Sequence, residues 1–171
     1  LTDEQGDFAL TDGVNSDDCE ISVLKSDDYL NGVSTLDLIL MQRHILGLED
    51  FDVARKYVAG DINLDTKVTA SDIVALRKLI LGITNKFNHE KSWRFVTDLP
   101  NFDKSSIIEL NEHYFIEKGV KDLSGLDFTG IKIGDIDNDS NLAVSAENRN
   151  NYVEIIEYSI EKIGDNETNV H

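Results

Sequence analysis

The chain is short of basic residues, cysteine and long apolar runs, and each shortage excludes something. Its 171 residues include 16 Lys and Arg against 33 Asp and Glu, a formal net charge of −17 with His neutral. A protein that binds a nucleic-acid backbone or anionic lipid needs a basic face, so both partners are excluded. No apolar run approaches the ~18 residues that insert across a membrane. The single cysteine, Cys19, cannot form an internal disulfide and leaves the redox compartment undecided.

Catalytic motifs are also lacking. Cys19 has no evident base, and the sequence contains neither an HExxH motif nor a glycine-rich phosphate loop. Carboxylate pairs of the kind that glycosidases use are uninformative in so acidic a chain. The histidines are scattered along the sequence, at His44, His89, His113 and His171. We therefore expect a chain that is not itself an enzyme.

What the sequence does contain is an internal repeat. Residues 33–48 (VSTLDLILMQRHILGL) and 68–83 (VTASDIVALRKLILGI) match when one is shifted by 35 positions. Each copy predicts a helix that begins near Ser34 or Ser71 and ends before a glycine in a left-handed conformation, Gly47 or Gly82. Apolar residues at helical spacing predict two helices packed roughly antiparallel through Leu38, Met41, Ile45 and Leu48 and through Ile73, Leu76, Ile80 and Ile83.

The segment before the second helix, residues 60–72 (GDINLDTKVTASD), has the spacing of an EF-hand calcium loop. Calcium takes about 6–8 oxygen ligands at about 2.3–2.6 Å, and alternate residues of a curled loop can aim oxygens at one centre. Thr66 stands where a turn glycine is usual, which adds strain. An ordinary polar turn with an N-capping Asp is the alternative. The predicted ligands, at loop positions 1, 3, 5, 7, 9 and 12, are Asp61, Asn63, Asp65, Lys67 through its backbone carbonyl, Thr69 and Asp72.

The equivalent segment before the first helix is degenerate and admits two registers. In the same register, Ser26 takes position 1 and Leu30, which cannot ligate, takes position 5. In a loop one residue shorter, Asp27 takes position 1 and Asn31–Gly32 take positions 5 and 6. A vestigial loop held by turn hydrogen bonds from Asn31 is the alternative to calcium. The predicted ligands are Asp28, Asn31, Ser34 and Asp37.

A third acidic segment, residues 134–142 (GDIDNDSNL), echoes residues 60–68 (GDINLDTKV). Asp135, Asp137 and Asp139 reproduce positions 1, 3 and 5, but Ala146 falls at position 12, so the terminal ligand is missing. Calcium bound by three carboxylates with backbone and water, or a solvated acidic turn, both fit this pattern.

The flanks predict short strands. The segments 93–96, 106–110, 113–117 and 127–133 are β-branched or aromatic and bounded by turn residues, as are 7–10 and 19–25, while 151–163 fits one long strand or a helix. We expect an α+β fold in which a pair of loop–helix repeats is flanked by short strands. The segment TDEQGDFAL resembles the turn and strand of an Ig-like β-sandwich repeat, which implies the C-terminal strands of such a repeat at 1–25. The other expected units are a two-loop calcium module at 26–89, a β-rich extension with the third acidic loop at 90–142, and a strand or linker to a following domain at 143–171.

The segments NGVSTLDLILMQRHILGL and AGDINLDTKVTASDIVALRKLILGI resemble a dockerin type I module. With SWRFV and DFTGIKIGDIDND, the chain is similar to the dockerin-like segment embedded in very large secreted, adhesin-like bacterial proteins, often linked to type IX secretion. The resemblance implies Ca²⁺ as cofactor, an extracellular or cell-surface location, and adjoining β-sandwich domains of the same chain or of a neighbouring surface protein as partners. The dockerin positions that face a cohesin correspond to Thr35, Leu36, Gln42 and Arg43 in the first copy and to Ala70, Ser71, Arg77 and Lys78 in the second. The predicted partner-binding residues among them are Gln42, Arg43, Arg77 and Lys78.

Two functions follow from that resemblance. The first is a non-catalytic, calcium-binding structural module of a long secreted or cell-surface protein, in which the strands pack on the helix pair through Trp93, Phe95, Phe128 and Ile131. The alternative is a cohesin-binding dockerin module of a polysaccharide-degrading enzyme or complex, which keeps its cohesin-facing residues in solvent.

Overall fold

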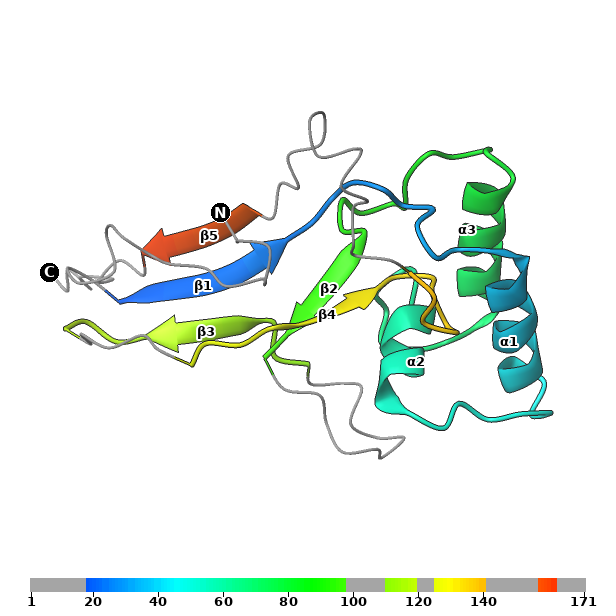
Figure 1. Cartoon of the computed structure of the whole chain (residues 1–171), viewed down its shortest axis with the longest axis horizontal. Coiled ribbons are helices and arrows are strands. Elements are labelled where there is room, and N and C mark those ends of the chain that lie inside the picture. The colour runs from blue at the N-terminus through cyan, green and yellow to red at the C-terminus, as the bar shows by residue number, and fades with distance from the viewer. Residues whose placement is uncertain (1–17, 98–109, 120–124, 141–156, 163–171) are drawn as a thin grey trace, which may run out of the picture.

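The computed structural model describes residues 18–97, 110–119, 125–140 and 157–162, the last as backbone. Over these ranges it contains three helices and two small antiparallel sheets, which confirms the α+β class. Figure 1 shows the helices at one end of the molecule, the three-stranded sheet at the other, and the two-stranded sheet between them. The elements are β1 (Cys19–Leu24), α1 (Thr35–Ile45), α2 (Ala54–Gly60), α3 (Ala70–Ile80), β2 (Trp93–Val96), β3 (His113–Ile116), β4 (Thr129–Lys132) and β5 (Glu157–Lys162).

The two helices of the repeat begin and end in the same way. Ser34 caps α1 and Thr69 caps α3, each within a capping box that satisfies backbone N–H groups at the start of the helix. The predicted cap Ser71 is wrong, because Thr69 lies in extended backbone two residues earlier and its hydroxyl accepts the N–H of Ser71. Gly47 and Gly82 have φ of +67° and +65°, as predicted for residues that follow a helix end.

The apolar stripes of α1 and α3 are buried over most of their length. Leu38, Met41, Ile73 and Leu76 belong to the main core, together with Leu79. The prediction is wrong for the ends of the stripes, where Ile45, Leu48 and Ile83 are 36%, 71% and 66% exposed. Ile45 lies in the last turn of α1, and Leu48 and Ile83 follow the left-handed glycines that turn the chain away from the helix axis.

The short helix α2 connects the two halves of the repeat. Its last four residues, Tyr57 to Gly60, are buried. Arg55 donates from Nη1 to the carbonyl of Asp135 at 3.0 Å and from Nη2 to that of Ile136 at 2.8 Å. This helix therefore fixes the backbone of residues 135–136 against the helical end of the molecule.

The two-stranded sheet shares the core of the helices. Strands β2 and β4 pair antiparallel from Trp93↔Lys132 to Val96↔Thr129. Val96 and Ile131 pack with the buried residues of α1 and α3, and Trp93 is buried. Of the other predicted anchors, Phe95 is half-buried, whereas Phe128 packs on a separate small core below the three-stranded sheet.

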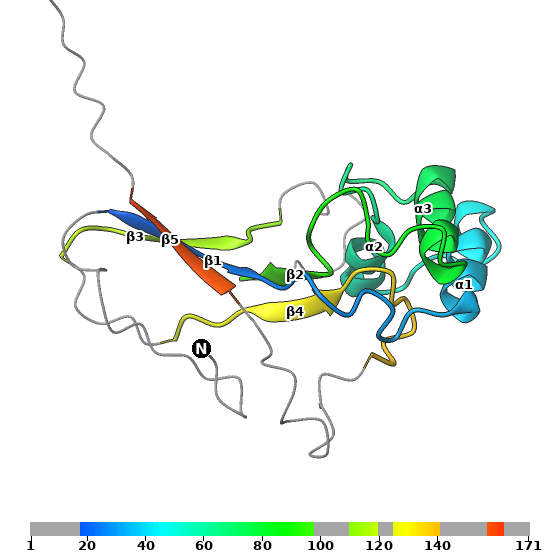
Figure 2. The same cartoon turned by 90° about the horizontal axis from the view of Figure 1, so that it is seen from above.

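The three-stranded sheet has the order β3-β1-β5, with both neighbours antiparallel to β1. Cys19 and Ile21 of β1 pack with Ile116 in its small core. For residues 151–163 the structure shows a strand over Glu157–Lys162, and the rest of that segment lies outside the described residues. The predicted strand at 7–10 and most of that at 106–110 also lie outside them. Figure 2 shows this sheet extending away from the helices.

Candidate metal centre

The loop at residues 61–72 closes around the side chain of its first residue. Asp61 is 1% exposed. Its Oδ1 accepts the N–H of Asp65 at 2.9 Å and its Oδ2 accepts the N–H of Thr66 at 3.0 Å. Thr66 has a φ of +70°, a left-handed conformation that strains a β-branched residue, as its place in the loop predicts. A single carboxylate therefore organises the turn.

Asp72, in the first turn of α3, closes the other end of this loop. Its Oδ1 accepts the N–H of Asn63 at 3.1 Å, and its Oδ2 accepts the N–H and the hydroxyl of Thr69 at 2.8 and 3.1 Å. The side chain is fully buried. Positions 1 and 12 of the predicted loop are thus both buried carboxylates, and each is held by backbone N–H groups.

The intermediate positions lie at the surface of the same loop. Asn63 Nδ2 donates to Asp65 Oδ2 at 2.9 Å, and the N–H of Lys67 donates to Asp65 Oδ1 at 3.0 Å. Asn63, Asp65 and Lys67 are exposed, and Thr69 is half-buried. The structure thus places all six predicted residues around one loop, with the amide of Asn63 bonded to the neighbouring carboxylate.

Residues 135–140 repeat the first half of that loop. Asp135 is fully buried; its Oδ1 accepts the N–H groups of Asn138 and Asp139 at 2.7 and 3.1 Å, and its Oδ2 accepts that of Ser140 at 3.1 Å. Asp139 and Ser140 follow Asp135 by four and five positions, as Asp65 and Thr66 follow Asp61. The φ of Asn138, +66°, matches the +60° of its counterpart Leu64.

The second half of this loop comes from the start of α1. Asp37 Oδ1 accepts the N–H of Ile136 at 2.7 Å and that of Asp137 at 3.4 Å, across 99 residues of sequence in the first case. Its Oδ2 accepts the N–H of Ser34 at 2.8 Å. Asp37 therefore serves residues 135–140 as Asp72 serves residues 61–66. We call the set of Asp37 and residues 135–140 the composite loop.

The joint between the two halves lies at Gly32 and Ser140. Gly32 has a φ of +67°, and a Cβ built on it would lie 2.6 Å from the Cα of Ser140. By the repeat, Gly32 corresponds to Lys67 and Ser140 to Thr66, which are joined by a peptide bond in the continuous loop. The composite loop therefore repeats the geometry of the 61–72 loop, with its two halves meeting in space between positions 6 and 7.

This pairing is absent from the sequence-based prediction, which sought the terminal ligand of the third segment at Ala146. Ala146 lies outside the described residues. The available signal was complementarity: the first loop lacks a ligand at position 5, whereas the third segment lacks one at position 12 and has position 5 in Asp139. When each segment is considered by itself, its missing ligand gives no indication that the other segment supplies it.

The composite loop gathers its carboxylates closely enough for one ion. Ligand oxygens of Asp37, Asp135 and Asp137 all lie within 4.8 Å of one another. Oxygens on opposite sides of a calcium ion stand about 5 Å apart, since each lies about 2.3–2.6 Å from the metal. Asp137 Oδ1 is buried and has no hydrogen-bond partner among the residues that the structure describes. A hard cation with oxygen ligands fits this arrangement.

The electrostatics of both loops favour a cation. Burial raises the pKa of Asp61, although the N–H groups of Thr66 and Asp65 and the Arg94 guanidinium act in the opposite direction. Burial also raises the pKa of Asp137, with Asp37 and the other carboxylates of the composite loop adding to the effect. Both carboxylates thus resist ionisation in the folded chain, and a bound cation would relieve that cost.

The remaining predicted ligands are not part of the three-carboxylate group. Asp28 is exposed with a φ of +46°, and its carbonyl accepts the N–H of Asn31. Asn31 is half-buried, Ser34 serves as the N-cap of α1, and Asp139 is exposed. The first loop as predicted therefore does not close on itself, because Asp37 turns to Ile136 instead.

The four predicted partner-binding residues lie on the helices. Arg43, Arg77 and Lys78 are exposed, and Gln42 is half-buried. Arg43 forms an exposed ion pair with Glu49 at 3.0 Å. The structure therefore leaves this set largely in solvent.

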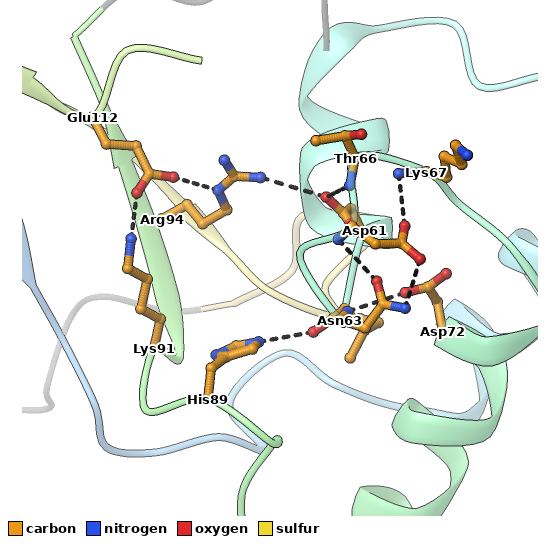
Figure 3. A network of polar contacts seen from close by, with 11 residues as sticks. Asp61, Asn63, Thr66, Lys67, Asp72, His89, Lys91, Arg94 and Glu112 are labelled. Atoms are coloured by element: carbon orange, nitrogen blue, oxygen red, sulfur yellow. Dashed lines mark hydrogen bonds and ion pairs between the residues drawn. The ribbon is translucent and has the colours of Figure 1, made fainter. Parts of the chain in front are cut away.

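Three buried or half-buried cations beside the loops have no counterpart in the sequence-based prediction. Arg55 holds the backbone of the composite loop, and Lys132 Nζ donates to the carbonyls of Tyr29 and Ile133 at 2.9 and 3.1 Å. The third is Arg94, which lies beside Asp61 (Figure 3). Their charges come from α2, β4 and β2, so only the tertiary fold brings them to the loops.

Comparison with known proteins finds no matching family model, no matching curated protein and no matching solved structure.

Proposed function

We propose that this chain is a non-catalytic calcium-binding structural module with one ion in the 61–72 loop and a second in the composite loop. The observation that supports it is the repetition of one hydrogen-bond pattern. In each loop a buried Asp at position 1 accepts the N–H groups at positions 5 and 6. A buried Asp at position 12 accepts the N–H at position 3 in the 61–72 loop and the N–H groups at positions 2 and 3 in the composite loop. In one case the loop is continuous, and in the other it joins two distant segments.

Calcium in the composite loop would join the start of α1 to the segment that follows β4. Metal bound only to the folded form stabilises it by mass action. The ion would supply positive charge among carboxylates, whereas Ser34, Ile136 and Arg55 already hold the backbone in place. Extracellular calcium modules bind with a Kd of about 10⁻⁴–10⁻³ M, which suits the extracellular or surface location that the dockerin resemblance implies.

The test is a calorimetric calcium titration of the full chain that counts ions. We expect two ions for the wild type, one for Asp65→Asn, one for Asp137→Asn and none for the double variant. Asp28→Asn is the matched control, because Asp28 is an exposed carboxylate of the first segment and should leave the count at two. A wild type that binds no calcium, or variants that leave the count unchanged, would overturn the proposal.

A second candidate function, docking to a protein partner such as a cohesin, is favoured by the outer face of the helices. Leu36, Ile39 and Leu46 of the α1 region are 48%, 50% and 71% exposed, and Val74 and Leu81 of the α3 region are 49% and 65% exposed. Such an exposed apolar area is typical of interaction sites.

The charged side chains that α1 and α3 themselves expose have one sign. The acidic residues within α1 and α3 are Asp37 and Asp72, and both are buried in the loops. The exposed charged residues of the two helices, Arg43, Arg77 and Lys78, are basic in a chain of net charge −17. A partner with an apolar surface and an acidic rim would complement them.

Docking is tested by titrating purified cohesin domains onto the full chain in calcium. Leu81→Lys should weaken any complex at least roughly tenfold, because it places a charge in the apolar face. Phe115→Lys is the matched control, since Phe115 is 66% exposed on β3 in the distant sheet. Equal binding by both variants would exclude the helical face.

Location is part of the same proposal. Among the residues that the structure describes, no helix has the length and apolar character needed to cross a bilayer. An extracellular or cell-surface setting, with β-sandwich domains of the same chain or of a neighbouring surface protein as partners, rests on the dockerin resemblance. Calcium occupancy at millimolar but not micromolar calcium would support that setting.

A further inference from the structure

A chain of charges leads from the β-sheets to the first ligand of the continuous loop (Figure 3). Arg94 Nε donates to Glu112 Oε1 at 2.6 Å, and Arg94 Nη1 lies 3.7 Å from Asp61 Oδ2. Lys91 forms an ion pair with the other oxygen of Glu112. The side chains of Arg94 and Glu112 are only 12% and 14% exposed, so solvent screens these charges weakly.

The guanidinium stands where it affects both states of the loop. Without a metal, its positive charge offsets that of Asp61, a carboxylate that is 1% exposed. With a divalent ion bound to the same carboxylate, the guanidinium and the ion repel each other. Glu112 and Lys91 complete a row of two carboxylates and two cations. Removing the charge of Glu112 or Lys91 therefore alters the electrostatic potential at Asp61.

We propose that Arg94 is a positioning residue that keeps the 61–72 loop folded without calcium and lowers the affinity of that loop for the ion. This inference rests on the proposed calcium function. Arg94 fixes Asp61 through a charge that calcium must oppose, and Glu112 tunes that charge by holding the guanidinium. The calcium affinity of the 61–72 loop is therefore lower than it would be without Arg94, but the loop keeps its folded conformation when calcium is low.

The experiment measures calcium affinity and chelator stability in the full chain, with Asp137→Asn as background so that only the 61–72 loop titrates. Arg94→Met should lower the melting temperature in chelator, yet tighten calcium binding at least roughly tenfold, since a divalent and a monovalent charge a few ångströms apart repel this much even in a water-like dielectric. Arg94→Lys, which keeps the charge, should stay close to the parent affinity.

Glu112→Gln provides the opposite perturbation. It leaves Arg94 in place but removes one balancing negative charge, so calcium binding should weaken several-fold. Opposite signs for Arg94→Met and Glu112→Gln cannot come from general loss of packing, which would weaken binding in both. Unchanged or weaker binding in Arg94→Met, or tighter binding in Glu112→Gln, would overturn the inference. If Arg94→Met does not fold in chelator, the affinity change of Glu112→Gln decides.

Failure of this inference is distinguishable from failure of the calcium function. A double-mutant cycle in chelator, with Arg94→Met, Asp61→Asn and both, measures the coupling of the two charges with no metal present. Coupling in chelator without any calcium binding would refute only the calcium function. Calcium binding without coupling would refute only the role of Arg94.

Discussion

Replacing Asp37 by alanine should destabilise the protein even when calcium is absent. Asp37 Oδ1 accepts the N–H of Ile136 at 2.7 Å, and Oδ2 accepts the N–H and the hydroxyl of Ser34 at 2.8 and 3.2 Å. The carboxylate is fully buried, so water cannot replace it at either donor without rearrangement. The substitution therefore removes both the bonds that cap α1 and the bond that closes the composite loop.

The expected cost follows from the donors that lose their acceptor. A buried N–H left without a partner costs about 1–3 kcal/mol, and loss of an N-terminal cap interaction costs about 1 kcal/mol. Asp37→Ala orphans the N–H of Ile136, which is buried, and weakens the cap at Ser34. We expect a loss of about 3 kcal/mol, a substantial part of the ~5–15 kcal/mol that stabilises a typical domain.

Urea unfolding in excess chelator measures this loss, with the fluorescence of Trp93 as signal. Trp93 is the single tryptophan and is 3% exposed, so unfolding should change its emission. Asp72→Ala is the matched control, since Asp72 makes the equivalent bonds within one continuous loop. We expect Asp37→Ala to be the more costly change, because it releases a segment that is 99 residues distant.

Two results would refute this reasoning. If Asp37→Ala unfolds within ~0.5 kcal/mol of the wild type, as substitutions at uninvolved surface sites do, the bonds to Ile136 and Ser34 do not stabilise the fold. If Asp37→Asn, which keeps one carbonyl acceptor, loses as much as Asp37→Ala in chelator, then charge rather than hydrogen bonding holds the composite loop.

Asp137→Asn should raise the melting temperature in chelator at neutral pH, because burial raises the pKa of that carboxyl and its ionisation therefore opposes folding. The same variant should gain less from calcium than the wild type; an equal gain in paired thermal melts would contradict this. Burial lowers the pKa of Lys132 from 10.5 to about 8, so its contribution makes stability rise with pH between about 8 and 10.5, by up to roughly 3 kcal/mol. Lys132→Met should flatten that rise in urea titrations at pH 7.5 and 9.5, whereas parallel curves would refute the assignment. Gly32→Ala should cost more than Gly82→Ala and remove one calcium, because both have positive φ but only at Gly32 would a Cβ collide with Ser140. Equal losses for the two glycine variants in the same melts would contradict the joint.

Local sequence information was sufficient for the helices and the continuous loop. The cap at Ser34 and the left-handed Gly47 and Gly82 depend on residues within a few positions of each helix. The cap of the second helix was predicted two residues late, at Ser71, whereas the structure has it at Thr69. The strain predicted at Thr66 also appears as a positive φ. These features depend on backbone geometry over one or two turns, which a contiguous segment encodes by itself.

Pairing between distant segments was not predictable in the same way. The strands β1 and β3 were located from their own pattern, yet the register Cys19↔Ile116 joins residues far apart in the chain. Likewise, counting Asp135 as position 1 puts position 12 at Ala146, whereas the structure supplies Asp37 from much earlier in the chain. The sequence of a short acidic segment does not indicate which helix N-terminus it contacts in the folded chain, because that contact depends on the packing of the whole core.

The pairing of β1 with β5 also has a mechanical consequence. Cys19 lies opposite Lys162 and Leu24 lies opposite Glu157, so the start of β1 and the end of β5 lie together at the end of the sheet away from the helices (Figure 1). Tension applied between Cys19 and Lys162 would peel the strands apart one hydrogen-bonded pair at a time, as a zipper opens, and not shear all pairs at once.

The helices and both loops would then lie outside the path of the force, which passes only through the paired strands β1 and β5. Calcium would hold the shape of the helices and loops without strengthening the pairing of these two strands. We therefore expect the first opening force in a single-molecule pulling experiment between these two positions to be the same in calcium and in chelator. Calcium-dependent resistance should appear only after the strands have separated, and a first opening force that rises with calcium would contradict this load path.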